Sequence, residues 1–111
     1  MITTFAGTGT DAYSGDNDQA SLAAVSGPEG IVVDSNGNVF FNDFSNHRVR
    51  KVTTATGIIT TYAGTGSATY SGDGSAATSA GLGSPLGLGI DASGTTSLAL
   101  LRTTNSVFFN R

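Results

Sequence analysis

The sequence predicts an all-β protein built from short antiparallel strands, and three observations support this fold class. Sixteen of its 111 residues are glycine and threonine is abundant, a composition that favours strands and tight turns over long helices. A long stretch of the chain recurs 57 residues later. Strand-length apolar runs bounded by turn residues lie between the two copies.

The repeat is the strongest organising feature of the chain. Residues 2–38 lie over residues 59–95 without a gap, and 17 of the 37 pairs are identical. The identical residues are mostly Gly, Thr, Ala, Pro and Asp, which supply the unusual backbone dihedrals that turns require. The two glycine-rich copies, residues 2–28 and 59–85, are therefore predicted to be ordered connections and not flexible linkers.

Four strands are predicted along the middle of the chain. Residues 30–34 ("GIVVD") and 38–42 ("NVFFN") are the first two, and Asn36-Gly37 between them is a strong hairpin signal. Residues 47–53 alternate between polar and apolar and form a third strand, and residues 58–63 form a fourth. Four antiparallel strands make one meander, and one meander per repeat of about 40–50 residues is typical of a β-propeller blade.

The segment "PEGIVVDSNGNVFFNDFSNHRVRKV", residues 28–52, resembles the NHL repeat, which is named for an Asn-His-Leu triplet. The triplet is represented here by Asn46, His47 and Arg48, and Asp43 matches the family's Asp at the end of the second strand. The glycine-rich spacers are similar to the connections between blades in tandem NHL proteins. This resemblance implies a propeller of four-stranded blades in which Asp43, Asn46, His47 and Arg48 stabilise a turn and do no chemistry.

The register of the repeat fails after residue 94. The run "NSVFFNR", residues 105–111, echoes "GNVFFND" at an offset of 68 instead of 57. The sequence therefore predicts an 11-residue interruption of the second blade, with no third strand. The whole is expected to be an incomplete propeller, either a fragment of a longer protein or the product of a gene with a damaged 3′ end. The predicted organisation is residues 1–27 as the last strand of a preceding blade plus a loop, 28–63 as a complete blade, 64–84 as a second loop, and 85–111 as a partial blade.

Charge and composition argue against several classes of function. The formal net charge is −3, so a nucleic-acid-binding role is not expected. Arg48, Arg50 and Lys51 are expected to be ordinary charges on a solvated outer strand that discourage pairing at its edge. No apolar run approaches the length of a membrane span, and no signal peptide is visible. The absence of cysteine excludes disulfides and thiolate chemistry.

No residue pattern predicts catalysis or a cofactor. His47 is the only histidine, so a multi-histidine zinc site cannot be built within this chain. Asp11, Asp16 and Asp18 lie in a glycine-rich loop and could coordinate calcium, but the second copy keeps only Asp73. We therefore predict no metal site, and expect Asp16 and Asp73 to cap short helical turns by accepting backbone N–H bonds.

The function expected from these features is a non-enzymatic binding or scaffold surface for a protein or glycan partner. Loops carry most binding in such folds, and the repeated spacers are the longest loops, so the candidate binding residues are Tyr13, Asp16, Asp18, Tyr70 and Asp73. The alternative is a piece of a propeller enzyme, a metal-dependent lyase or hydrolase, whose catalytic residues lie outside this chain. Blades bury their faces against neighbours, so the isolated chain is expected to self-associate.

Overall fold

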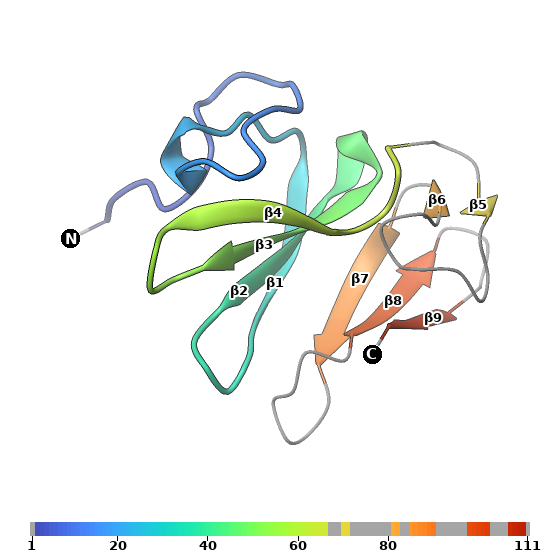
Figure 1. Cartoon of the computed structure of the whole chain (residues 1–111). Coiled ribbons are helices and arrows are strands. Elements are labelled where there is room, and N and C mark those ends of the chain that lie inside the picture. The colour runs from blue at the N-terminus through green and yellow to red at the C-terminus, as the bar shows by residue number, and fades with distance from the viewer. Residues whose placement is uncertain are drawn as a thin grey trace.

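The computed structural model describes residues 2–66 in full and the backbone of five further strands at 70–71, 81–82, 85–90, 98–102 and 107–110. The described part is all-β, as predicted, with two short 3-10 helices (Figure 1). In chain order the elements are η1 (Ala20–Leu22), β1 (Pro28–Val33), β2 (Val39–Asp43), η2 (Phe44–Asn46), β3 (Arg48–Thr53), β4 (Ile58–Ala63), β5 (Tyr70–Ser71), β6 (Gly81–Leu82), β7 (Pro85–Ile90), β8 (Leu98–Arg102) and β9 (Val107–Asn110).

The first sheet confirms the predicted four-stranded meander. Its strands run antiparallel in the order β1-β2-β3-β4, so each strand pairs with the next one in the sequence. The strand limits shift slightly from those predicted. β1 begins at Pro28 and β2 extends to Asp43, whereas His47 lies outside β3 in a left-handed conformation with φ of 56°. This arrangement is consistent with a single propeller blade.

The predicted hairpin between β1 and β2 is present, and Asp34 organises it. The Gly37 N–H donates to the Asp34 carbonyl at 3.0 Å, and the Asp34 N–H donates to the Asn38 carbonyl at 2.9 Å. The Asp34 Oδ1 also accepts the N–H groups of Asn36 and Asn38, each at 2.9 Å. Gly37 has φ of +82°, the left-handed conformation that closes a three-residue hairpin loop at no steric cost to glycine.

One face of the first sheet is covered by the first spacer, the glycine-rich segment of residues 7–27 that precedes β1. Val39, Phe41, Val52 and Ile59 have their side chains on this face, because directly opposed residues in a sheet share a face. They pack against two alanines of the spacer, Ala20 and Ala23, with Ala6 and Val25 at the margin. The spacer is thus an ordered part of the fold, and its small residues allow it to lie close to the sheet.

The other face of the first sheet is turned toward the second sheet. β7 lies against β1 and β2, on the opposite side of the sheet from η1 (Figure 1). Phe40 and Val49 on this face are fully buried, and the Phe40 ring meets Tyr62 edge-on with 4.9 Å between ring centroids. The first sheet is therefore the middle layer between the spacer and the second sheet.

The second sheet corrects the predicted organisation of the second blade. Its strand order is β7-β8-β9, and β7 pairs with β8 as β1 pairs with β2. The pair Leu88↔Leu100 stands where Ile31↔Phe41 stands in the first sheet, and both first strands have a register irregularity near their start. Residues 98–102 are thus the second strand and residues 107–110 the third. The predicted 11-residue interruption and the predicted absence of a third strand are both wrong.

Residues 107–110 were predicted to be a second strand because their sequence, "VFFN", also occurs in β2. An apolar run is compatible with either the second or the third strand of a blade, so this similarity does not identify the position. Hydrogen-bond register distinguishes the two positions, and it places residues 107–110 beside β8 on the side away from β7. The connection between β7 and β8 is only two residues longer than the connection between β1 and β2. The spacing in sequence between corresponding residues of the two sheets is therefore nearly the same for the second strands as for the first strands.

Residues 2–6, predicted to be the last strand of a preceding blade, are not a strand in this structure. A strand needs a hydrogen-bonded neighbour, and no described segment pairs with these residues in a sheet. The segment is attached to the fold at its end, where Ala6 packs against the core and the Gly7 N–H donates to the Ala20 carbonyl at 3.0 Å.

Candidate functional site

Arg50 lies at the centre of a buried charged cluster between β3 and the first spacer. Its side chain is 0% exposed, so the prediction that it lies on a solvated strand is wrong. One terminal nitrogen is 2.9 Å from the Asp43 Oδ2, and the other is 3.0 Å from the Asp16 Oδ1. The guanidinium also donates to the carbonyls of Ser14 and Ala24, at 3.0 and 3.3 Å. A buried arginine requires such partners, because an unpaired charge is costly away from water.

Asp43 joins three parts of the chain. Its Oδ1 accepts the backbone N–H of Ser26 at 2.8 Å and the side-chain amide of Asn46 at 2.9 Å, while Oδ2 receives Arg50. The Asn46 amide also donates to the Ala12 carbonyl at 2.9 Å. Asp43 at the end of β2 therefore holds the last residues of the spacer against η2 and β3.

Asp16 belongs to the same cluster and does not cap a helical turn. Its Oδ2 accepts hydrogen bonds from Tyr13, at 2.7 Å, and from Thr61 on β4. The prediction of a cap is wrong, because the N-cap position of η1 is Gln19 and no side chain caps it. Burial raises the pKa of Asp16, but the hydrogen bonds from Thr61 and Tyr13 and the charge of Arg50 outweigh burial, and the net pKa is lowered.

Tyr13 covers the cluster from the solvent side. The Arg48 guanidinium carbon lies 3.6 Å from the centroid of the Tyr13 ring, and that of Arg50 lies 4.7 Å from it. Stacking between a guanidinium and an aromatic face is favourable, more so when it is partly desolvated. The Tyr13 side chain remains at the surface, since the residue is 38% exposed. Five of the residues selected from the sequence are thus brought together around Arg50, namely Tyr13, Asp16, Asp43, Asn46 and Arg48.

The remaining predicted residues lie apart from this cluster. Asp18 is exposed, and its Oδ1 accepts the N–H of Gln19 at 2.8 Å. His47 follows η2, where its N–H donates to the Phe44 carbonyl at 3.2 Å. Tyr70 begins β5 and pairs with Leu82 of β6. Asp73 lies outside the described residues.

The described part of the chain holds no group of three His, Asp or Glu side chains placed to bind a metal ion. Both carboxylate oxygens of Asp16 are occupied by Arg50, Tyr13 and Thr61, which leaves Asp11 and Asp18 without the third predicted ligand. Within the same residues, no helix has the length and apolar character needed to cross a membrane.

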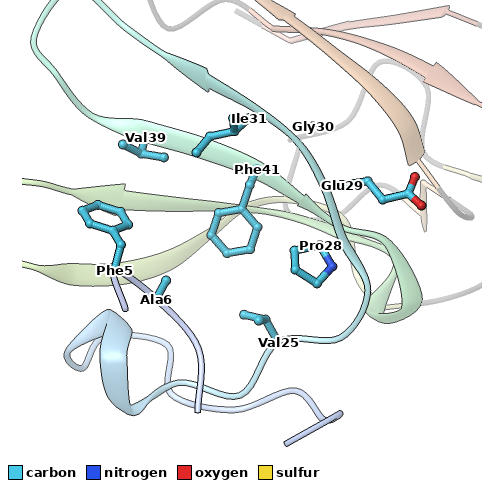
Figure 2. A pocket seen from close by; sticks show the side chains of 9 residues that line it. All are labelled: Phe5, Ala6, Val25, Pro28, Glu29, Gly30, Ile31, Val39 and Phe41. Carbon is cyan, nitrogen blue, oxygen red and sulfur yellow. The ribbon is translucent and has the colours of Figure 1, made fainter. Parts of the chain in front are cut away.

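An apolar hollow opens on the spacer side of the sheet, beside β1. Its volume is about 350 Å³. Figure 2 shows Phe5, Val25, Ile31 and Phe41 arranged around it, with Glu29 at its rim. The remaining lining residues are Ala6, Pro28, Gly30 and Val39. The sequence analysis did not identify this hollow, because the continuous apolar run of residues 31–33 does not show which face of β1 is left uncovered.

No protein-family model matches the sequence, and no curated protein matches it. Among solved structures, the chain is similar to a structural genomics protein of unknown function from Bacteroides thetaiotaomicron VPI-5482, with a TM-score of 0.78 and 21% sequence identity. The similarity covers 95% of this chain and 26% of the other, so the chain spans about a quarter of that protein's length. At this identity the likeness concerns the fold alone.

Proposed function

We propose that the chain is a segment of an NHL-like β-propeller whose blades form a binding or scaffold surface for a protein or glycan partner. The observation that carries the proposal is the charged cluster around Arg50, which fixes the first spacer to the face and edge of the blade. Ionisable side chains that a hydrolase or lyase would need are here bonded to one another. Their arrangement suits a rigid surface better than a reacting site.

A rigid loop favours binding, because it loses little conformational entropy when a partner docks. The spacer presents the partly exposed ring of Tyr13 and the exposed carboxylate of Asp18 on a backbone held by Asp16 and Asp43. An aromatic ring beside polar groups suits recognition of sugars and of peptide side chains. Asp16 is not a candidate contact for the partner, because its carboxylate oxygens already accept hydrogen bonds from within the chain.

The alternative, a metal-dependent lyase or hydrolase, would need catalytic residues from outside this chain. His47 stands alone as a histidine, and its backbone closes the turn after η2.

The test is a screen of the purified chain on glycan and peptide arrays, followed by calorimetric titration of the strongest hit. Asp18→Ala is expected to weaken binding at least tenfold without lowering the melting temperature, because Asp18 is exposed. Ser35→Ala, in the exposed turn between β1 and β2, is the matched control and is expected to bind normally. Binding that is indifferent to Asp18 would exclude the spacer as the surface. Cleavage of an arrayed glycan in the presence of divalent metal would favour the enzyme alternative.

A further inference from the structure

The tip of the hairpin between β1 and β2 carries an asparagine that is followed by a glycine. Asn36 is exposed, and its backbone N–H donates to Asp34 while its side-chain amide stays at the surface. Gly37 has no side chain, so its nitrogen can approach the side-chain carbonyl carbon of Asn36 more closely than the nitrogen of a larger residue could. Asparagine is a thermolabile residue type, and this close approach is what the loss of its amide requires.

The loss of the amide needs water as its only co-reactant. The deprotonated Gly37 nitrogen attacks the Asn36 Cγ, the new C–N bond closes a succinimide ring, and the Asn36 amide nitrogen leaves as ammonia with the proton that Gly37 lost. Water then adds to one of the two ring carbonyls and breaks its bond to the ring nitrogen. The product is aspartate or isoaspartate, with one water consumed and one ammonia released.

Other described asparagines are less suited to this reaction. The Asn38 side-chain oxygen accepts the Thr54 N–H at 3.2 Å, and the Asn46 side-chain amide donates to Asp43 at 2.9 Å. Asn17 is exposed, but an aspartate follows it and hinders approach of the next backbone nitrogen. The hairpin tip thus holds the one asparagine of the described residues that is both exposed and followed by glycine.

The fold holds this loop closed, chiefly through Asp34. The Gly37 N–H donates to the Asp34 carbonyl at 3.0 Å, and this bond must break before the nitrogen loses its proton. The Asp34 carboxylate accepts the N–H groups of Asn36 and Asn38, each at 2.9 Å. From the turn after β3, the Thr54 hydroxyl donates to the Gly37 carbonyl at 3.1 Å. The Gly37 nitrogen therefore reaches the Asn36 side chain only when the loop opens locally.

We propose that Asn36 is a deamidation site of this protein and that Asp34, together with Thr54, sets the rate by keeping the loop closed. The product places a new carboxylate two residues from Asp34, which is already a buried acid. The isoaspartate form also adds one carbon to the main chain of a loop that joins strands in fixed register, with Val33 opposite Val39. Deamidation therefore loosens the hairpin that joins β1 to β2.

Peptide mass spectrometry of the whole chain after incubation at mildly alkaline pH tests the site and its control. In the folded chain, conversion is expected at Asn36 and not at Asn38 or Asn46, and it is expected to be at least tenfold faster in guanidinium chloride. Asp34→Ala is expected to accelerate conversion of Asn36 about tenfold, because two hydrogen bonds no longer hold the loop. Circular dichroism checks that this variant is folded.

Thr54→Val gives a second measurement that does not depend on Asp34. Thr54 is exposed, so the variant is expected to fold, lose the bond to the Gly37 carbonyl and convert Asn36 about threefold faster. Thr56→Val is the matched control, because Thr56 is exposed in the same turn but its hydroxyl donates to the Thr53 carbonyl. A folded chain that leaves Asn36 intact would overturn the site. Equal rates in wild type and Thr54→Val, or in folded and unfolded chains, would overturn the control by the loop.

Discussion

At the scale of single residues, Arg50 and its two carboxylates decide how the first spacer meets the blade. Asp43 and Arg50 are both fully buried, so removing the Asp43 carboxylate leaves the buried Arg50 charge with only one of its two ion-pair partners. Loss of one partner from a buried pair typically costs about 3–5 kcal/mol. Asp43→Ala is therefore expected to lower the free energy of unfolding by about 3–5 kcal/mol in urea titrations.

Asp43→Asn separates charge from hydrogen bonding at the same position. Its amide oxygen can still accept the N–H of Ser26 and the amide of Asn46, so this variant is expected to fall between wild type and Asp43→Ala. Asp18→Ala, at an exposed carboxylate, serves as the control and is expected to unfold like wild type. Equal stability of all four proteins would mean that the buried pair contributes nothing.

Asp16 makes stability depend on pH in the acid range. Hydrogen bonds and Arg50 lower the pKa of Asp16 in the folded protein despite its partial burial. A carboxylate with a depressed folded pKa contributes stability above its unfolded pKa of about 3.9, and this contribution is lost as pH falls through the folded value. Asp16→Asn is therefore expected to lower the melting temperature near neutral pH and to converge with wild type at strongly acid pH. A constant difference between the two proteins from neutral to strongly acid pH would contradict this role.

The burial of Arg50 was not predictable from the sequence, for a physical reason. The run "HRVRKV" alternates, so it shows that Arg50 and Val49 point to opposite faces but not which face is covered. The covering spacer and its Asp16 are distant in sequence, and only the fold brings them to β3. The grouping of Asp43, Asn46 and Arg48 near one turn was predictable, because those residues are close in sequence.

At the scale of elements, the packing of the spacer explains its repeated glycines. Gly15 has φ of +89°, and a Cβ added there would lie 2.6 Å from the Cα of Ala23. Gly9 has a similar φ of +86°, but a Cβ there would meet nothing within 4 Å. Gly15→Ala is therefore expected to be clearly less stable than Gly9→Ala, which carries only the left-handed penalty of about 1–2 kcal/mol. Thermal melts of the two variants test whether the spacer is as closely packed in solution, and equal losses would contradict it.

The strands of the first sheet were predictable because local signals agree with each other there. Apolar runs, the Asn36-Gly37 turn and the alternation of β3 all point to one meander. The second sheet was predicted incorrectly because sequence similarity and strand order disagree: β9 resembles β2 in sequence but takes the place of β3. Arg102 and Phe108 consequently occupy the register positions of Asp43 and Arg50, so the buried ion pair of the first sheet is not repeated in the second.

At the scale of the whole molecule, the two faces of the first sheet differ in how they are covered. β7 lies against one face, whereas the spacer covers the other only in part and leaves the hollow beside β1 open. The exposed apolar side chains of β1 are thus not needed for the fold of one copy. The self-association that the sequence predicts for the isolated chain would bury them.

Lysine substitutions on β1 test whether this exposed face takes part in the expected self-association. Burial of an exposed Ile or Val side chain contributes about 1.5–3 kcal/mol, and a tenfold change in affinity corresponds to about 1.4 kcal/mol. Ile31→Lys and Val33→Lys are each expected to weaken self-association at least tenfold in sedimentation equilibrium, with an unchanged melting temperature of the dilute protein. Leu22→Lys is the matched control, because Leu22 is 63% exposed but lies on η1, outside the hollow. If Leu22→Lys weakened association as much as the β1 variants, the contact would be a general hydrophobic one and not specific to β1.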